Sequence, residues 1–272
     1  MRSISLFYLT IFIYLTATIL YTISLLRRRV HPAKHASWTM AIAFLLHSLL
    51  IFSIWGKRGY PLFASTYDVL MFFAWSLTGF YLLFQLRTKT RVLGISIAPV
   101  SLVLLLFSSP GISGPVAAPK ILNSGLVNLH ILLALMGEAW FVLATLASCA
   151  YLIQDRLLKG KAPKRLFSYL PPLKDLDRIN EWALIWGFVS LTLGILAGMF
   201  YARLAWAGGW HLDTKIIWSW VAWIVFAILV HQRLAIGWQG RRPAIFTCLF
   251  FVFLALTSLA ETCLFSSLHR FF

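Results

Sequence analysis

Histidine is the residue type in this chain that points most clearly to a chemical role. Five of the seven histidines lie inside or beside long apolar runs. His47 and His231 lie within such runs, whereas His130 and His269 lie near the ends of two others. Neutral imidazole nitrogens are axial ligands of haem iron, so two facing histidines in an apolar cavity suit haem. We therefore expect an outer pair, His130 with His269, and an inner pair, His47 with His231.

Each histidine also has a simpler interpretation, because a single imidazole in a membrane helix is often a hydrogen-bonded packing residue. Zinc is the poorer candidate, since the chain has no His-x-x-x-His or Cys-x-x-Cys spacing. At about 1.5 Å per residue, His47 lies about 14 Å and His231 about 8 Å from the nearest basic loop. Helix tilt can absorb that difference. His211 lies in a loop, where we expect it to be a bystander.

A tryptophan-rich stretch precedes the seventh apolar run. Trp206 and Trp210 flank a Gly-Gly pair, Asp213 follows, and Trp218 is the fourth residue of the run. Tryptophans at this depth can form the aromatic belt of a membrane interface. A belt does not need the glycines or the aspartate, whereas flat indoles beside a glycine turn form a platform for a planar macrocycle. We expect Asp213 to cap the helix that follows in either case.

Four acids lie in or at the ends of apolar runs, where an ionisable group is costly. We expect Asp68 and Glu181 to lie at helix N-termini, where a carboxylate is favourable. Glu138 and Glu261 lie deeper, and each could pair with an arginine, be protonated or pack as a neutral acid. The three cysteines, Cys149, Cys248 and Cys263, also lie in apolar runs, where we expect small buried residues.

The composition defines the class of protein. The 272 residues are 60% hydrophobic and 12% charged, with a mean hydropathy of +0.83. Soluble domains average about 45–50% apolar and about 25% charged residues. The composition excludes a water-soluble enzyme, a disordered chain and a fibrous protein, and it predicts a polytopic membrane protein.

Eight apolar runs are long enough to predict an all-α integral membrane protein with eight transmembrane helices. None alternates with a period of two, which excludes a β-barrel. No soluble domain is evident, so residues 1–272 are predicted to form a single polytopic membrane domain. The runs cover residues 4–26, 38–55, 67–86, 93–109, 126–153, 180–202, 215–236 and 243–265.

The net charge of +16 comes from basic loops. Of the 24 lysines and arginines, 17 lie in the loops after the first, third, fifth and seventh runs, and 7 lie on the other side. The positive-inside rule assigns the first set to the cytoplasm and puts both termini and the 203–214 loop outside. The charge is therefore a topology signal, and we expect no nucleic-acid partner.

The stretch 206–218 resembles the WWD segment of the cytochrome c assembly superfamily, and most closely its CcsA and HemX branch. In that branch the segment leads into a helix ending Leu/Val-His-x-Arg, as Val230-His231-Gln232-Arg233 does here. The resemblance covers nearly the whole chain. Other matching stretches are Ser65-Thr66-Tyr67-Asp68, Leu129-His130 followed by Gly137, Leu173-Lys174-Asp175-Leu176-Asp177-Arg178, and Gly237-Trp238-Gln239-Gly240.

This resemblance implies a haem-binding and haem-delivery protein of cytochrome c maturation in the bacterial inner membrane. Haem b would be bound or transported, and presented to apocytochrome c at the outer face by the WWD-like loop at 203–214. By the same resemblance His130 and His269 are the outer iron ligands, and His231 and His47 the intramembrane ones. A second membrane protein with a large outer domain, similar to ResB or CcsB, is the implied partner.

The stretch departs from the family pattern at Ala207, at Leu212, at Thr214-Lys215-Ile216-Ile217 and around His269. The enzyme question therefore stays open between the haem-presenting subunit of a cytochrome c synthase (haem lyase) and a binder without that activity. The sequence offers no catalytic nucleophile. The alternative function is a HemX-like membrane regulator of glutamyl-tRNA reductase, with the basic loop 154–179 as its contact surface.

The charge asymmetry makes a prediction about topology. Cysteines introduced into the 203–214 loop and at either terminus should react with a membrane-impermeant maleimide added outside the cell, because the positive-inside rule places them there. Cysteines introduced into the basic loop 154–179 are the control and should react only after the membrane is opened. A cytoplasmic C-terminus would contradict the topology and would remove His269 from the outer side.

Overall fold

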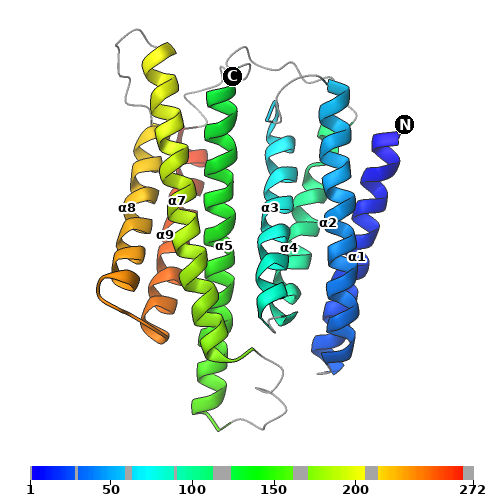
Figure 1. Cartoon of the computed structure of the whole chain (residues 1–272), viewed down its shortest axis with the longest axis vertical. Helices are drawn as coiled ribbons and strands as arrows, with labels where there is room; N and C mark the ends of the chain where they lie inside the picture. The colour runs from blue at the N-terminus through cyan, green and yellow to red at the C-terminus, as the bar shows by residue number, and fades with distance from the viewer. Residues whose placement is uncertain are drawn as a thin grey trace.

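The chain forms long helices that run side by side (Figure 1). The computed structural model describes residues 2–27, 30–58, 63–88, 91–112, 124–161, 171–205 and 214–265. The described part is helical apart from short turns and loop residues. The helices are α1 (Arg2–Arg27), α2 (Val30–Arg58), α3 (Thr66–Arg87), α4 (Gly94–Phe107), α5 (Gly125–Lys159), α7 (Leu173–Ala205), α8 (Thr214–Leu234) and α9 (Arg241–Phe265).

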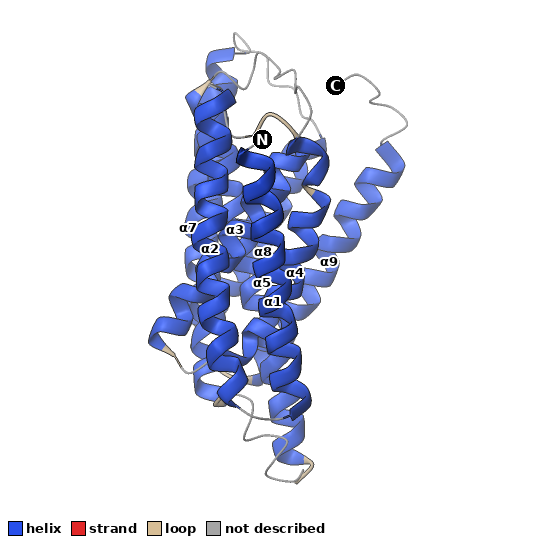
Figure 2. Ribbon diagram, turned by 90° about the vertical axis from the view of Figure 1, so that its right-hand side faces the viewer, coloured by secondary structure: helices blue, strands red, loops and turns tan. Residues whose placement is uncertain are grey.

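Successive helices alternate in direction. The start of α1, the end of α7, the start of α8 and the end of α9 lie at one end of the bundle (Figures 1 and 2). We call this the outer end, after the side predicted for it. The ends of α1, α3, α5 and α8 lie at the opposite end, which we call the inner end. The strongly basic stretches of the sequence therefore adjoin the inner end, whereas the helical part of the chain begins and ends at the outer end.

The helices make this a multi-pass membrane protein. Within the described residues, six helices are long and apolar enough to cross a membrane: Ser3–Arg27, His31–Lys57, Thr66–Leu86, Gly125–Lys159, Leu173–Leu204 and Ile216–Leu234. The predicted count is eight. The helix at 91–107 is shorter and contains Pro99, and the described side chains of α9 end at Thr257.

The predicted inner loop 154–179 is too long. α5 continues to Lys159 and α7 begins at Leu173, so helix occupies both ends of that stretch. Asp155 accepts an i,i+4 bond from Lys159 at 2.9 Å, which supports the added turn of α5. On α7, Leu176 and Ile179 are fully buried, so packing extends the helix through residues whose charges suggest a loop.

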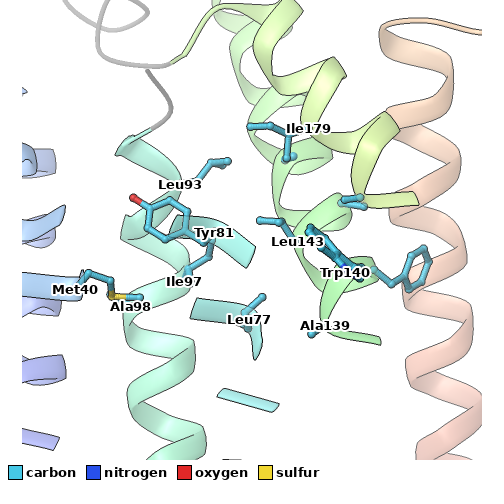
Figure 3. Packing of buried hydrophobic residues seen from close by; sticks show 14 of the residues in the cluster. Met40, Leu77, Tyr81, Leu93, Ile97, Ala98, Ala139, Trp140, Leu143 and Ile179 are labelled. Atoms are coloured by element: carbon cyan, nitrogen blue, oxygen red, sulfur yellow. The ribbon is translucent and has the colours of Figure 1, made fainter. Parts of the chain in front are cut away.

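Two groups of helices meet where α3 contacts α5. Trp140 of α5 stacks on Phe80 of α3 with ring centroids 3.7 Å apart. Figure 3 shows Trp140 and Leu143 on one side of this region, with Tyr81, Leu77 and Ile97 on the other. These residues belong to one continuous buried core. The core holds α5 at the centre of the bundle, between α3 and the helices α7 and α9 (Figure 1).

α5 and α7 approach each other very closely. A Cβ added to Gly137 of α5 would lie 3.2 Å from the carbonyl oxygen of Gly187. Nearer the outer end, a Cβ on Gly194 would lie 3.2 Å from the backbone nitrogen of Ala134. Gly194 and Gly198 form a Gly-x-x-x-Gly pair, the pattern that lets two membrane helices bring their backbones together. The outer part of α5 is thus packed directly on the α7 backbone.

An ion pair organises the inner end of α7, α8 and α9. Arg233 Nη1 lies 3.0 Å from Asp177 Oδ1, and it also donates to the carbonyl oxygen of Trp238 at 2.9 Å. The backbone N–H of Gly240 donates to Asp177 Oδ1 at 2.9 Å. Gly240 has φ +77°, a conformation that glycine adopts without strain. Three stretches that are distant in sequence therefore form one hydrogen-bonded turn.

Replacing Arg233 with alanine should destabilise the protein markedly. The Arg233 side chain is 1% exposed and that of Asp177 is 19% exposed, so the change leaves a largely buried carboxylate without its partner. We expect a loss of roughly 2–4 kcal/mol, somewhat below the cost of breaking a fully buried pair. The measurement is the free energy of unfolding in mixed micelles.

Arg241→Ala is the matched control for this change. The Arg241 side chain is 56% exposed and lies 3.9 Å from Asp155, so its loss should cost less than about 1 kcal/mol. Equal effects of the two substitutions would contradict the structural role given to Arg233.

Candidate haem cavity

A cavity of about 400 Å³ lies among five helices in the outer half of the bundle. This volume is in the range of small-molecule sites, roughly 300–1,000 Å³. Its walls are mostly apolar, and its polar side chains include His130 and Glu138. The lining residues are Phe73 of α3; His130, Ala134, Glu138, Phe141 and Val142 of α5; Leu191 and Ile195 of α7; Trp218, Ser219, Ala222 and Phe226 of α8; and Phe251, Leu254, Ala255 and Thr257 of α9.

His130 is fixed in one tautomer by α7. Its Nδ1 lies 2.7 Å from the carbonyl oxygen of Gly194. A carbonyl can only accept, so Nδ1 carries the hydrogen and donates it, and the lone pair of the ring is on Nε2. This is the arrangement of metal-binding histidines, in which a second hydrogen bond orients the ring and leaves one nitrogen for the metal. In the neutral ring, Nε2 therefore remains available as an acceptor or as a metal ligand.

Gly198 makes room for this imidazole. A Cβ at Gly198 would lie 2.8 Å from His130 Nδ1 and 3.1 Å from its Cε1, closer than packed carbon atoms allow. The ring consequently lies directly against the α7 backbone at Gly198. Any side chain at position 198 would have to displace it.

Trp218 is the member of the tryptophan-rich stretch that the structure describes, and it lines the cavity from the first turns of α8. α8 is held against α7 by a hydrogen bond from Trp223 Nε1 to Thr192 Oγ1 at 2.9 Å. Phe226 and Phe141 meet at a ring distance of 4.7 Å on the inner side of the cavity. Aromatic rings therefore line the cavity at more than one level, as a planar apolar ligand would need.

Glu138 is the cavity residue that sequence reasoning left without a role. It lies on α5 two turns inward from His130, about 12 Å along the helix. His130, Ala134, Glu138 and Val142 follow one another at intervals of four, so they share a face of the helix. That spacing is the signal that could have linked the acid to the histidine before the structure was known.

The predicted inner pair is not brought together. His47 of α2 is fully buried, and its Nδ1 lies 3.2 Å from the hydroxyl of Tyr14 in α1. His231 is exposed near the end of α8. Figure 1 shows α2 and α8 on opposite sides of the bundle. The two histidines match in approximate depth but not in lateral position, so they cannot bind opposite faces of one iron in this arrangement.

His47 belongs to a polar network in the first four helices. The Tyr14 hydroxyl donates to Thr78 Oγ1 at 3.1 Å, and Thr78 donates to Ser101 Oγ at 2.9 Å. All four side chains are buried. This is the hydrogen-bonded packing role that the sequence left open for a single intramembrane histidine.

Several predicted site residues lie outside the described residues. These are Trp206, Trp210, His211, Asp213 and His269. Glu261 lies within α9, but its side chain is also outside the described part. α8 begins at Thr214, directly after Asp213, and α9 ends at Phe265.

The two predicted helix-capping acids have different outcomes. Asp68 is confirmed at the N-terminus of α3, where Ser65 is the N-cap and donates its backbone N–H to Asp68 Oδ2 at 3.1 Å. The placement of Glu181 is wrong, because α7 begins at Leu173 and puts Glu181 in the helix interior. The buried contacts of Leu176 and Ile179 account for this earlier start.

A family model described as "Cytochrome C assembly protein" matches residues 63–269. This range includes α3 through α9, the whole cavity and the inner turn of Asp177 and Arg233. This match defines a membrane protein of the cytochrome c assembly class. The chain belongs to the cytochrome c assembly protein family.

The curated relatives narrow this membership to the CcsA branch. The cytochrome c biogenesis protein CcsA of Chlamydomonas reinhardtii is 32% identical over 85% of this chain and 67% of its own length. CcsA of Porphyra purpurea is 28% identical over 94% of this chain and 93% of its own. CcsA of Microcystis aeruginosa is 28% identical over 85% of each. A role in cytochrome c maturation follows, and the regulator of tetrapyrrole synthesis is not favoured.

The contact between Gly198 and His130 can be tested through stability. Gly198→Ala should destabilise the protein by about 1–3 kcal/mol, the usual cost of overfilling a packed site. The added methyl group must push the imidazole off Gly194. Unfolding in mixed micelles, followed by circular dichroism, measures the change.

Gly56→Ala is the matched control, because a Cβ at Gly56 meets no atom within 4 Å. That change should leave stability unchanged or raise it by up to about 1 kcal/mol through helix propensity. A neutral effect of Gly198→Ala would show that the histidine ring does not depend on this close approach.

Proposed function

We propose that this protein binds haem in the outer cavity and presents it at the outer face for attachment to apocytochrome c. The single observation that carries this proposal is the hydrogen bond from His130 Nδ1 to the Gly194 carbonyl, which leaves Nε2 free to bind iron. The cavity volume and the aromatic lining support the same ligand. Membership of the cytochrome c assembly family supports the purpose of the binding.

His269 is the second axial ligand in this proposal. α9 lines the cavity with residues up to Thr257 and ends at Phe265, four residues before His269. α9 runs towards the outer end, the end at which His130 also lies, and this supports a second ligand from the same side of the bundle (Figure 2). We assign neither His47 nor His231 to this iron, since one is buried against α1 and the other is exposed near the inner end of α8.

Trp206, Trp210 and Trp218 form the stacking platform in this proposal, and Asp213 caps α8. Trp218 already lines the cavity, which supports a platform at its outer edge. In the bilayer the chain spans the membrane eight times as one polytopic domain, with both termini outside. The membrane in this proposal is the bacterial inner membrane, and haem b is the cargo.

Bound haem supplies the vinyl groups to which cysteine thiols of the apocytochrome add. Each addition forms one sulfur–carbon bond and leaves the thiol proton on the neighbouring vinyl carbon. The residues of this chain hold the macrocycle, orient it through His130 and exclude water with aromatic side chains. A second membrane protein with an outer domain would bring the apocytochrome to the site, and together they would form the synthase.

Replacing His130 with alanine tests the iron ligand. The purified variant should lose most of the Soret absorbance per chain, or shift it towards a five-coordinate spectrum, because one axial nitrogen is gone. Free imidazole should restore the band in part by filling the vacated space. His269→Ala should behave in the same way.

His35→Ala is the control, because His35 is exposed at the inner end and should not affect the spectrum. An unchanged spectrum in both the His130 and His269 variants would contradict the proposed ligands. If His211→Ala alone removed the haem, the ligand would come from the tryptophan-rich loop instead.

A further inference from the structure

Two cysteines from different helices meet on the inner side of the cavity. Cys149 Sγ of α5 and Cys248 Sγ of α9 lie 3.6 Å apart. They are 99 residues apart in the sequence, so only the fold brings them together. The expectation that both are small buried residues is wrong for Cys149, which is exposed, while Cys248 is partly buried.

A buried clamp fixes the level at which these cysteines face each other. Asn180 Nδ2 of α7 donates to Ser148 Oγ at 2.8 Å and to Thr247 Oγ1 at 3.0 Å. Ser148 and Thr247 are the neighbours of the two cysteines in sequence, and both are fully buried. The clamp therefore sets the register of α5 against α9 in the interior of the bundle. The thiols lie at the same helix contact, on the surface of the bundle.

The surface around the thiols is apolar. Ile153 of α5 is 54% exposed, and Leu249 and Val252 of α9 are 59% and 53% exposed. In a membrane protein such a surface faces the lipid tails. A reagent that dissolves in the bilayer can therefore reach this pair from the lipid side.

We propose that Cys149 and Cys248 form a reversible disulfide site on the lipid-facing surface, oxidised by a membrane-soluble quinone. In this step the two S–H bonds break and one S–S bond forms. The two electrons and two protons pass to the quinone, which becomes the hydroquinone. The disulfide links α9 to α5 on the inner side of the cavity. Reduction by a thiol, or the reverse reaction with the hydroquinone, breaks this link.

The tie bears on the cavity because α9 forms one of its walls. Phe251, the first α9 residue that lines the cavity, lies three residues after Cys248, and its ring is 6.1 Å from that of Phe141. Oxidation would hold this wall against α5 and slow the exchange of the ligand. This consequence rests on the proposed haem function, whereas the disulfide itself does not.

The experiment uses the full chain in lipid nanodiscs, with Cys263→Ser so that only the pair remains. Duroquinone is the oxidant, because a methyl group occupies every ring position to which a thiol could otherwise add. Two thiols per chain should be lost for each hydroquinone formed, and mass spectrometry should find an intramolecular link between Cys149 and Cys248. Failure of the link to form, or links only between chains, would overturn the proposal.

A displaced pair serves as the matched control. Cys248→Ser with Val252→Cys keeps the number of thiols, moves one thiol a turn outward and places it at a position more exposed than that of Cys248. Oxidation of this pair should be at least about tenfold slower, because a disulfide needs Cβ atoms within about 3.5–4.5 Å. Equal rates would show that exposure alone decides the reaction.

Two further measurements test the parts of the proposal. Thr247→Val removes the bond to Asn180 at nearly constant volume and should slow oxidation several-fold. Glutathione disulfide in the water phase should react more slowly than duroquinone, and an equal rate would overturn the lipid-side access.

The last measurement is haem transfer to apomyoglobin before and after oxidation. Oxidised protein should release haem several-fold more slowly than reduced protein, and a chain with both cysteines changed to serine should not respond. Equal release would overturn the link to the cavity. A reduced protein that never retains haem would refute the proposed function and leave the disulfide standing.

Discussion

The close approach of α5 and α7 is the constraint on which the rest of the structure depends. Without side chains at Gly194 and Gly198, the α7 backbone can reach the His130 ring and accept its hydrogen bond. That bond selects the tautomer and therefore the nitrogen that remains for a metal. In the membrane such an arrangement requires close van der Waals contact between helices, because lipid gives them no hydrophobic reason to associate.

The remaining helices are attached to this pair by a small number of polar contacts. Trp223 joins α8 to α7, and Asn180 joins α9 to α7 and α5. Arg233 pairs with Asp177 at the inner end. The cavity is the space between α3, α5, α7, α8 and α9, where the contacts are mostly aromatic and apolar. One group of contacts thus fixes the positions of the helices, and another forms a wall suited to a flat ligand.

Local patterns predict the helical membrane class, because apolar length and loop charge are properties of short segments. Contacts across the bundle are different. The depth of His47 and of His231 can be calculated from the chain, but their lateral separation depends on the order of the helices, which hydropathy does not encode. The early start of α7 could not be predicted for a similar reason, because charged residues flank the buried Leu176 and Ile179 in the sequence. The shared helix face of Glu138 and His130 could have been predicted from the sequence, because their spacing of eight residues is a multiple of four.

The hydrogen bond from Asn180 makes Thr247 a fixed point about which the rest of α9 would tilt. Gly240 and Thr247 fix its first turns to α7, and the helix then continues for about 27 Å to Phe265. Figure 2 shows this outer part slanting away from the bundle. A tilt of about 5° around Thr247 would move Phe265 by about 2 Å, given that length, and would hardly move Phe251. Such a tilt would widen the mouth of the cavity while its base keeps its shape.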